Sequence, residues 1–482
     1  MVSVIFAPVA LWERHWSYAI EVAHQEHKLG NSTLIIHCES ALKSCAANPH
    51  NQPSKCKQCI HQVHYSVKRH FPDSTRHIYI SDLDVELTRQ SLRIPDLKDM
   101  DSLFDYTYES FHFGLDVISQ LISIQRDRNI WNNDLVELAN NLLANSIAMY
   151  EIMKARLPKD ISKVYLWGGR RSSEAPVKYF ARFKNLDLIF FEEASAFNRF
   201  TLSEKEPTTY SFVFDSIREW EQHRAVSVGV PYMMLEAQKY FSDRRQGKSK
   251  EPSFIWFLSN SKKLDLKVSE KPILAIFTSS DWEFAALESR PDKESSHELG
   301  NQYLVLPRIL RDPVFLDKFQ LVVRWHPNHV TSGKFEKNQV ASIVSSNSHV
   351  HHILPSDNQN SYDLVEMADT VLVFGSTIGI ESAFMGKPTI LIGKASYSGL
   401  GAVYEPETYL NLQELIVSNL KPLSNFGAVL WADWSKNRGK SLESIEVRGN
   451  AFYLNDNRIL SIKLSMRIKA ALKRMSRHLV GQ

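Results

Sequence analysis

Residues 2–38 read VSVIFAPVALWERHWSYAIEVAHQEHKLGNSTLIIHC. The apolar run 2–9 predicts a β-strand. Residues 13–29 place Trp16, Ile20 and Ala23 at helical spacing, and Gly30 follows as a residue typical of a helix end. Residues 33–38 predict a second strand. A strand, a helix and a strand over this length form a βαβ unit, which opens a parallel α/β sheet.

The same alternation returns in two further parts of the chain. The apolar segments 164–169 and 186–193 flank a helix predicted from about Glu174 to Phe183. We therefore predict an α/β protein with two facing Rossmann-like domains, whose ligands bind beyond the carboxyl ends of the strands, in an interdomain cleft. In the C-terminal half, strands are predicted at 272–278, 319–327, 351–355, 370–376 and 388–393, with a helix from Ile378 to Met385 before the last of them.

These patterns also predict the domain boundaries. Residues 1–265 are expected to form the N-terminal domain, with a cysteine-containing insertion at 39–62 and a helical segment at 103–157. Residues 266–440 are expected to form the C-terminal domain. Residues 441–482 are expected to form a helical, basic tail.

The overall composition excludes several classes of protein. The chain has 482 residues, 43% of them apolar, and 57 basic against 54 acidic side chains. A net charge of +3 is too balanced for a protein that coats nucleic acid. No apolar stretch approaches the roughly 18–20 residues of a membrane-spanning helix. Because the first residues lack the positive segment of a signal peptide, and only four cysteines are present, we expect a cytoplasmic protein without disulfides.

The segment GSTIGIESAFMGKP, residues 375–388, carries the best signal for a binding site. A strand runs into Gly375, Ser376 and Thr377, and a helix follows, so free N–H groups and hydroxyls are available to a phosphate. Gly375 and Gly379 would let the backbone approach a ligand closely. Glu381 could accept hydrogen bonds from ribose hydroxyls. The alternative is an ordinary helix with a Ser or Thr cap.

Residues 322–328, VVRWHPN, place Arg324, His326, Pro327 and Asn328 at the end of another strand. Arg and His donate hydrogen bonds suited to a leaving phosphate group. Pro327 would fix the turn after His326. The alternative is an Arg in a surface ion pair and a His that caps the strand.

Two further strands end in polar residues. In FTSSDWEF, residues 277–284, Ser279 and Ser280 follow a strand, with a helix-capping box as the alternative to a ligand site. In FEEASAF, residues 191–197, the pair Glu192 and Glu193 ends a strand of the N-terminal half. Either carboxylate could be the general base that accepts the proton of an acceptor hydroxyl, or a solvated charge.

The ordered set FTSSDWEF, RWHPN and PSDNQNSYDLVEMADTVLVFGSTIGIESAFMGKP resembles bacterial capsule and surface polysaccharide biosynthesis proteins with the GT-B glycosyltransferase fold, mostly over residues 270–400. GGRRSSEAP (168–176) followed by FEEAS resembles their strand–NGR–helix–strand–Glu segment, which makes Arg170 the matching Arg. Gly169 stands where that pattern has Asn, and Ala194 where it has Gly. The pairs His326-Pro327 and Ser376-Thr377 also resemble the "HP" and "SS/ST" motifs of GT-B transferases that use CMP-activated acidic sugars.

This resemblance implies a metal-independent glycosyltransferase. It would move a sugar from a nucleotide-sugar, with a CMP-activated acidic sugar favoured, to a surface glycan or lipid-linked acceptor. The alternatives are a polyol-phosphate transferase of the CDP-glycerol type, a UDP-sugar 2-epimerase and a non-catalytic nucleotide-sugar-binding subunit. The resemblance implies that Glu192 or Glu193 is catalytic and that the donor contacts Arg170, Ser279, Ser280, Arg324, His326, Pro327, Asn328, Gly375, Ser376, Thr377, Gly379 and Glu381.

Two features stand apart from these motifs. Cys38, Cys45, Cys56 and Cys59 lie within 22 residues, and the CxxC pair is of the type that chelates zinc, so the spacing predicts a structural zinc site, with four free thiols as the alternative. Residues 461–482 contain six basic residues and no acidic one, at helical spacing with apolar residues. This pattern suits an anionic membrane surface, hence peripheral attachment at the inner face of the plasma membrane, or a helix packed on the N-terminal domain.

Overall fold

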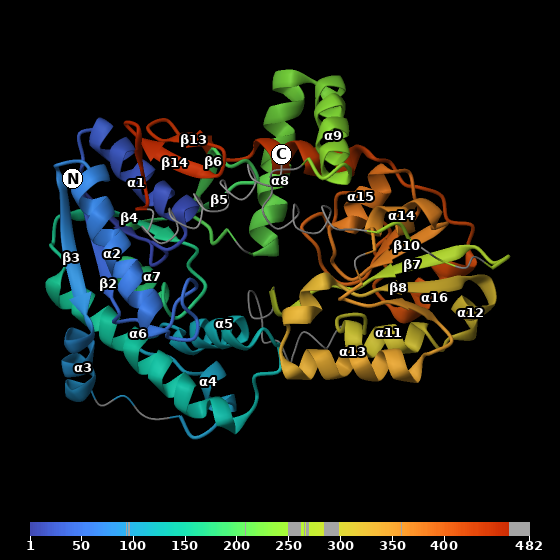
Figure 1. Cartoon of the computed structure of the whole chain (residues 1–482), viewed down its shortest axis with the longest axis horizontal. Coiled ribbons are helices and arrows are strands. Elements are labelled where there is room, and N and C mark those ends of the chain that lie inside the picture. Colours follow the sequence, from blue (N-terminus) through green and yellow to red (C-terminus); the bar gives the residue numbers. More distant parts are fainter. Residues whose placement is uncertain are drawn as a thin grey trace, which may run out of the picture.

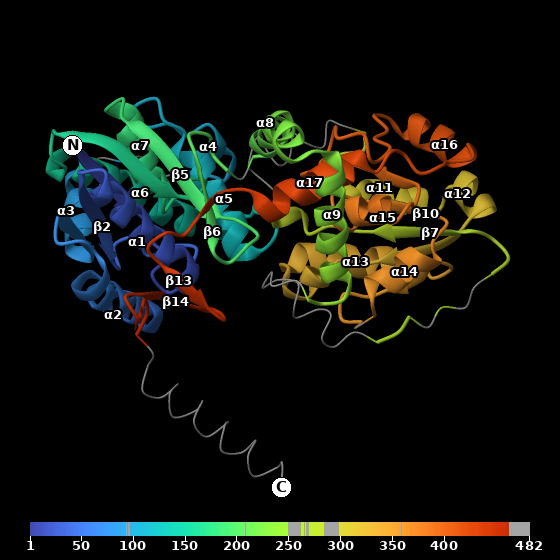
Figure 2. The ribbon, with the colours of Figure 1, turned by 90° about the horizontal axis from the view of Figure 1, so that it is seen from above.

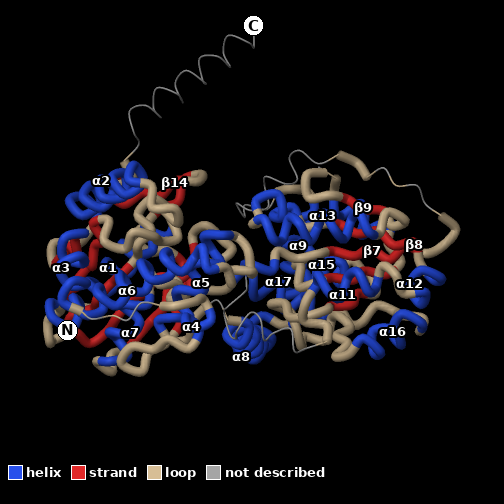
Figure 3. The backbone as a smooth tube through the Cα atoms, turned by 90° about the horizontal axis from the view of Figure 1, so that it is seen from below, coloured by secondary structure: helices blue, strands red, loops and turns tan. Residues whose placement is uncertain are grey.

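In the computed structural model, two sheets lie side by side, each covered by helices on both faces (Figure 1, Figure 3). The structure describes residues 1–461 apart from 93, 95–96, 208, 249–261, 265, 267–268, 284–297 and 358. The predicted α/β class with two Rossmann-like halves is confirmed. The basic segment predicted for membrane contact lies, from residue 462 onward, outside the described residues. Across the described part of the chain, none of the helices is both long enough and apolar enough to cross a bilayer.

The N-terminal sheet has the strand order β12-β6-β5-β4-β1-β2-β3. The strands β1 to β5 run parallel, whereas β6 and β12 are each antiparallel to their neighbour. The sheet consists of β1 (Val2–Phe6), β2 (Ser32–Glu39), β3 (Thr75–Ser81), β4 (Ile161–Trp167), β5 (Asp187–Glu193), β6 (Arg199–Ser203) and β12 (Lys440–Ser441).

Two groups of helices bury the faces of this sheet. On one face lie α1 (Glu13–Lys28) and α2 (Pro53–His70). On the other face lie α3 (Asp82–Ser91), α4 (Asp101–Phe104), α5 (Phe113–Gln125), η1 (Asn133–Leu135), α6 (Val136–Arg156) and α7 (Ala175–Phe183).

The C-terminal sheet is entirely parallel, in the order β11-β10-β7-β8-β9. One of its helices, α12 (Pro313–Lys318), begins with local signals: Pro313 lies in its first turn, and the Asp312 carboxylate accepts from the N–H of Val314 at 2.9 Å. The strands are β7 (Ile273–Phe277), β8 (Gln320–Arg324), β9 (His351–Ile353), β10 (Thr370–Val373) and β11 (Thr389–Leu391).

The helices of this half again form two layers. One face is covered by α11 (Gln302–Ile309), α12 (Pro313–Lys318), α13 (Lys334–Ser346) and α16 (Tyr409–Val417). The other face is covered by α14 (Ser361–Met367), α15 (Ile378–Phe384) and α17 (Phe426–Asn437). Two 3-10 helices, η2 (Asp281–Glu283) and η4 (Pro327–Thr331), lie shortly after the ends of β7 and β8.

The helices α8 (Tyr210–Val228) and α9 (Val230–Arg245) correct the expected domain boundary. They fall within the 1–265 segment that the sequence assigns to the N-terminal domain. In the structure, Ile217, Met233 and Phe241 are buried in the core that packs on the C-terminal sheet. Because their apolar faces fit that core, residues 210–245 belong to the C-terminal half (Figure 1).

The end of the described chain returns to the N-terminal half (Figure 2). After α17, β12 pairs with β6, and β13 (Glu446–Arg448), β14 (Ala451–Leu454) and β15 (Asn457–Arg458) form a small antiparallel sheet. Phe452, Leu454 and Ile459 bury their side chains with Trp16 of α1. The expected helical tail is therefore wrong for residues 441–460, which form short strands because alternate apolar side chains pack against α1.

Candidate functional site

The acidic pair at the end of β5 meets the first turn of α1. Arg14 Nη1 lies 3.0 Å from Glu193 Oε2, and His15 Nε2 lies 3.6 Å from a carboxylate oxygen of each of Glu192 and Glu193. These contacts form because β1 and β5 are parallel and end at the same edge of the sheet. An arginine, a histidine and two carboxylates therefore share one corner of the N-terminal half.

The two carboxylates have different surroundings. Glu192 accepts hydrogen bonds from the indole N–H of Trp167 at 3.2 Å and from the N–H of Glu193 at 2.9 Å. Burial alone would raise the pKa of Glu192, but the hydrogen bond and charge of His15 outweigh it and lower the pKa below its ordinary value. The side chain of Glu193 is 46% exposed, against 21% for Glu192. Glu192 is thus a carboxylate kept ionised by its hydrogen bonds and by His15, whereas the carboxylate of Glu193 is the more accessible to solvent.

Arg14 and His15 are site residues that the sequence reasoning missed. In the sequence they fall within an amphipathic helix, and nothing local marks them as functional. Arg14 also donates to the carbonyl oxygen of Ala194, the residue that stands where the related pattern has Gly. The signal that could have found them is their place, just beyond the carboxyl end of the first strand.

A cavity of about 480 Å³ opens beside the acidic pair, between the N-terminal sheet edge and helices α8 and α17. Aromatic rings, carboxylates and cations share its wall. Its lining includes Glu192, Glu193, Thr201, Ser203, Glu204, Lys205, Phe212, Asp215, Glu219, Trp220, Trp434, Arg438 and Lys440.

Arg170 links the two halves of the molecule. The loop after β4 bends through Gly168 and Gly169, with φ of 71° and 108°, and a Cβ on Gly169 would approach Phe190 Cδ1 to 2.9 Å. Arg170 Nη1 then donates to the carbonyl oxygen of Glu283 at 2.9 Å. Burial, reinforced by the neighbouring Arg171, lowers the pKa of Arg170 to about 10, so the guanidinium stays charged at neutral pH. The structure thus gives Arg170 an interdomain contact.

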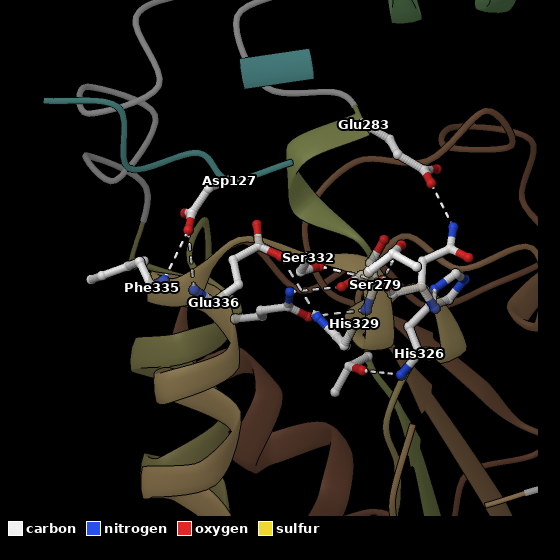
Figure 4. A network of polar contacts seen from close by, with 12 residues as sticks. Asp127, Ser279, Glu283, His326, His329, Ser332, Phe335 and Glu336 are labelled. Atoms are coloured by element: carbon white, nitrogen blue, oxygen red, sulfur yellow. Dashed lines mark hydrogen bonds and ion pairs between the residues drawn. The ribbon is translucent and has the colours of Figure 1, made fainter. Parts of the chain in front are cut away.

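The strand-end loops of β7 and β8 are tied together in the C-terminal half (Figure 4). The N–H of His326 donates to Thr278 Oγ1 at 2.8 Å, and the N–H of Asn328 donates to His326 Nδ1 at 3.2 Å. Burial lowers the pKa of His326 to about 3, so its imidazole is neutral. Since Nδ1 is an acceptor, the ring proton resides on Nε2 and can be donated.

Glu283 is a further site residue that the sequence reasoning did not select. Asn328 Nδ2 donates to Glu283 Oε1 at 2.6 Å, and burial raises the pKa of that carboxyl. Hydrogen bonds therefore connect Arg170 in one half through Glu283 and Asn328 to His326 in the other. The negative charge of Glu192 acts on Arg170 through space.

The segment 375–377 lies next to the loop after β7. Gly375 has φ of 79°, and a Cβ there would lie 3.9 Å from Ser279 Oγ. Ser279 is held through its backbone by Gln302, at 3.0 and 2.9 Å, and Ser280 is buried. Ser376 is half-buried and Thr377 is exposed, directly before α15. The structure therefore brings the serines of both motifs to one edge of the sheet.

Gly379 plays a different part from the one expected. A Cβ at this position would approach Val373 Cγ2 to 2.7 Å and would also meet Tyr397 Oη. Tyr397 in turn donates to the carbonyl oxygen of Ser376 at 2.5 Å. Only glycine fits at position 379, because the side chains of Tyr397 and Val373 pack against α15 there. These side chains fill the space that a ligand was expected to approach.

Two residues that were expected to contact the donor, Arg324 and Glu381, instead bond to other groups of the C-terminal half. Arg324 is 4% exposed and donates to the carbonyl oxygen of Leu354 at 2.6 Å. Glu381 is 3% exposed, lies 3.0 Å from Arg244 Nη2 and also accepts from the hydroxyl of Tyr362. Both side chains are buried, and each is held by a partner from another segment of the C-terminal half.

The four cysteines line one cavity of about 40 Å³ between β2, α2 and the loop that joins them. Burial raises the pKa of Cys45 to about 11 and of Cys59 to about 12, and it also raises that of Cys38, which favours protonated thiols. Within the described ranges, which include all four cysteines, no three His, Cys, Asp or Glu side chains are grouped so that they could hold a metal ion. The zinc site stays a prediction that metal analysis would test.

Comparison with protein families matches residues 312–415 to the family described as capsule polysaccharide biosynthesis protein. The resemblance expected from the sequence is confirmed over that segment, which contains the HP and ST motifs. A comparison with the sequences of curated proteins gave no match.

Comparison with solved structures gives matches at low identity. A β-Kdo 2,4-transferase, KpsC of Thermosulfurimonas dismutans, is 13% identical, with 56% of this chain and 79% of that chain covered and a TM-score of 0.36. UDP-GlcNAc 2-epimerase of Neisseria meningitidis is 12% identical (90% and 96% covered, TM-score 0.28). MurG of Acinetobacter baumannii is 10% identical (90% and 94% covered, TM-score 0.28).

Proposed function

We propose that this chain is a glycosyltransferase of capsule-type polysaccharide biosynthesis. It transfers a sugar from a nucleotide-sugar, for which we favour a CMP-activated acidic sugar, to a glycan or lipid-linked acceptor. The family match over residues 312–415 supports a role in capsule polysaccharide biosynthesis. The observation that carries the proposal is the hydrogen-bonded connection from Arg170 through Glu283 and Asn328 to the loop of His326. The charge of Glu192, in the acidic pair of the N-terminal half, also acts on Arg170.

The C-terminal half would hold the nucleotide. A neutral His326 with its proton on Nε2, together with the hydroxyls of Ser376 and Thr377 at the start of α15, offers donors to the phosphate oxygens. Because these donors supply the stabilisation of the leaving phosphate, we expect transfer without a divalent ion. Activity that persists in EDTA would agree with this expectation.

The N-terminal half would hold the acceptor in the 480 Å³ cavity. As the acceptor oxygen bonds to the anomeric carbon, the bond from that carbon to the phosphate oxygen breaks and its electron pair leaves with the nucleotide. The hydroxyl proton passes to a carboxylate. We assign this role to Glu193, which is the more exposed of the pair, and we assign to Glu192 the task of holding His15.

The first experiment compares nucleotide release from CMP-, UDP- and GDP-sugars by the wild-type chain and by Glu193→Gln. Loss of a positioned general base costs about 10²–10⁴-fold in rate, so we expect Glu193→Gln to lose transfer by that factor and to bind nucleotide as before. Glu204→Gln is the matched control, because Glu204 lines the same cavity and is exposed.

An isomerised sugar nucleotide without release would instead identify an epimerase. Full transfer activity in Glu193→Gln would remove Glu193 from the role of base. An equal loss in Glu204→Gln would show that the effect comes from cavity charge and not from a base.

A further inference from the structure

The end of α5 in the N-terminal half meets the first turn of α13 in the C-terminal half (Figure 4). Asp127, two residues beyond α5, is 5% exposed. Its Oδ2 accepts from the N–H of Phe335 at 2.9 Å and from the N–H of Glu336 at 3.4 Å. The first residue before α13 is Gly333, which has no side chain to cap the helix. Asp127 therefore supplies, from the other half, the carboxylate that this helix start lacks.

The backbone on both sides is shaped for this contact. Arg126 has φ of 51° and its carbonyl oxygen accepts from the N–H of Gly333 at 2.8 Å. A Cβ on Gly333 would approach the Cβ of Asp127 to 2.6 Å. The side chain of Trp282, from η2 of the C-terminal half, packs against the N-terminal core, with the Arg126 guanidinium 5.9 Å from its ring. The two halves thus touch at a close-fitting surface.

The helix that Asp127 caps is joined to the loop of His326. Only Ser332 and Gly333 separate η4 from α13. His329 of η4 and Glu336 of α13 are both buried, with His329 Nδ1 3.6 Å from Glu336 Oε2. The hydroxyl of Ser332 donates to the carbonyl oxygen of Asn328 at 3.4 Å. A shift of α13 would therefore move η4, and with it the residues that follow β8.

We propose that Asp127 is a positioning residue, which holds the His326–Asn328 loop in its binding geometry by capping α13 across the domain interface. The proposal rests on the proposed function, because that function assigns nucleotide binding to this loop. Asp127 itself touches no substrate. It acts through α13 and η4, so the acceptor half of the molecule sets the geometry of the donor half.

The test uses the full chain with Asp127→Ala, Asp127→Asn and Thr408→Ala. Thr408 caps α16 within the C-terminal half, where its side chain accepts from the N–H of Asn411 at 3.1 Å. Thr408→Ala is therefore a control that removes a helix cap away from the domain interface. Two quantities are measured for each variant. One is the affinity for CMP by calorimetric titration, and the other is the rate of amide hydrogen exchange over residues 326–340.

We expect Asp127→Ala to weaken CMP binding by roughly fivefold or more, the factor that corresponds to loss of a helix cap, and to speed exchange over 326–340. Asp127→Asn keeps an oxygen acceptor, so its affinity should stay within about threefold of wild type. Thr408→Ala should lose stability but bind CMP as the wild type does.

Unchanged CMP affinity and unchanged exchange in Asp127→Ala would overturn the proposal. Equal weakening in Thr408→Ala would also overturn it, because general loss of stability would then explain the effect. A wild-type chain that binds no CMP would count against the proposed donor, whereas faster exchange in Asp127→Ala would still establish that Asp127 fixes the loop.

Discussion

At the scale of single residues, His326 shows how the fold prepares a phosphate donor. An exposed imidazole has an ordinary pKa of about 6.5 and is therefore partly protonated near neutral pH. Burial, together with the charges of His329 and Arg324, lowers the pKa of His326 to about 3. The N–H of Asn328 occupies Nδ1. The ring is therefore a neutral donor through Nε2 over the whole physiological range of pH.

The lowered pKa of His326 predicts a loss of stability in acid. Because the unfolded chain binds this proton first, the free energy of unfolding should fall as the pH drops from about 6.5 towards 3, by up to about 1.4 kcal/mol per pH unit for this site. His326→Asn keeps an acceptor for the N–H of Asn328 but cannot titrate. Denaturant unfolding at pH 7, 6 and 5 should therefore give a flatter profile for the variant. Parallel profiles would show that His326 does not titrate as described.

The sequence could mark polar residues at strand ends, because the strand pattern itself locates those ends. It could not show which of them face a ligand. Arg324 and Glu381 are held by Leu354 and Arg244, which lie 30 and 137 positions away, and burial by such distant partners leaves no local signal. Arg14 and His15 were missed for the converse reason, since the sheet brings them to Glu192 and Glu193.

At the scale of elements, α15 shows that a small residue in a motif can serve packing. Gly379 leaves room for Tyr397 and Val373, and Tyr397 holds the carbonyl of Ser376. The close approach of α15 to its neighbours thus positions the segment 375–377.

This packing predicts that Gly379→Ala destabilises the protein. The added methyl group has no space, and overpacking of this kind costs about 1–3 kcal/mol. We expect a lower melting temperature by calorimetry and weaker nucleotide binding, because α15 must shift. The double variant with Tyr397→Phe, which removes the hydroxyl in the way, should recover part of the loss. A melting temperature equal to wild type for Gly379→Ala would contradict this account of the glycine.

Elements with strong periodicity were predictable, and their partners were not. The βαβ unit of residues 2–38 and the strands of the C-terminal sheet appear where the apolar patterns place them. The start of α13 is different, because its cap comes from Asp127, some 200 residues earlier in the chain. A cap supplied across an interface cannot be recognised from the residues around the helix.

At the scale of the whole molecule, the described part of the chain passes from the N-terminal to the C-terminal half and later returns. The helices α8 and α9 leave the N-terminal sheet for the C-terminal core, and the segment after α17 returns (Figure 2). Sequence patterns alone do not reveal where a segment packs, because its position depends on which core its apolar face covers. Domain boundaries drawn between such patterns therefore miss these crossings. The N-terminal half is therefore incomplete without a segment that follows the C-terminal half in the chain.

This exchange predicts that the return segment is needed for the N-terminal half to be stable. A chain that ends at Asn437 loses the buried side chains of Ile445, Phe452, Leu454 and Ile459. At about 1.5–3 kcal/mol each, this loss is on the order of the stability of a whole domain. We expect such a chain to unfold at lower temperature and to bind a hydrophobic dye, whereas a chain ending at Ser461 keeps the return segment. Equal melting of both chains would contradict the assignment.

The central claim is that the C-terminal half binds the nucleotide of a sugar donor at the His326 loop and the start of α15. The most direct test is a thermal-shift titration of the wild-type chain and His326→Ala with CMP, CDP, UMP, UDP, GDP and TDP. A ligand that binds only the native state raises the melting temperature by mass action. We predict a rise with CMP that His326→Ala abolishes. The absence of a rise with every nucleotide, or an equal rise in His326→Ala, would contradict the account.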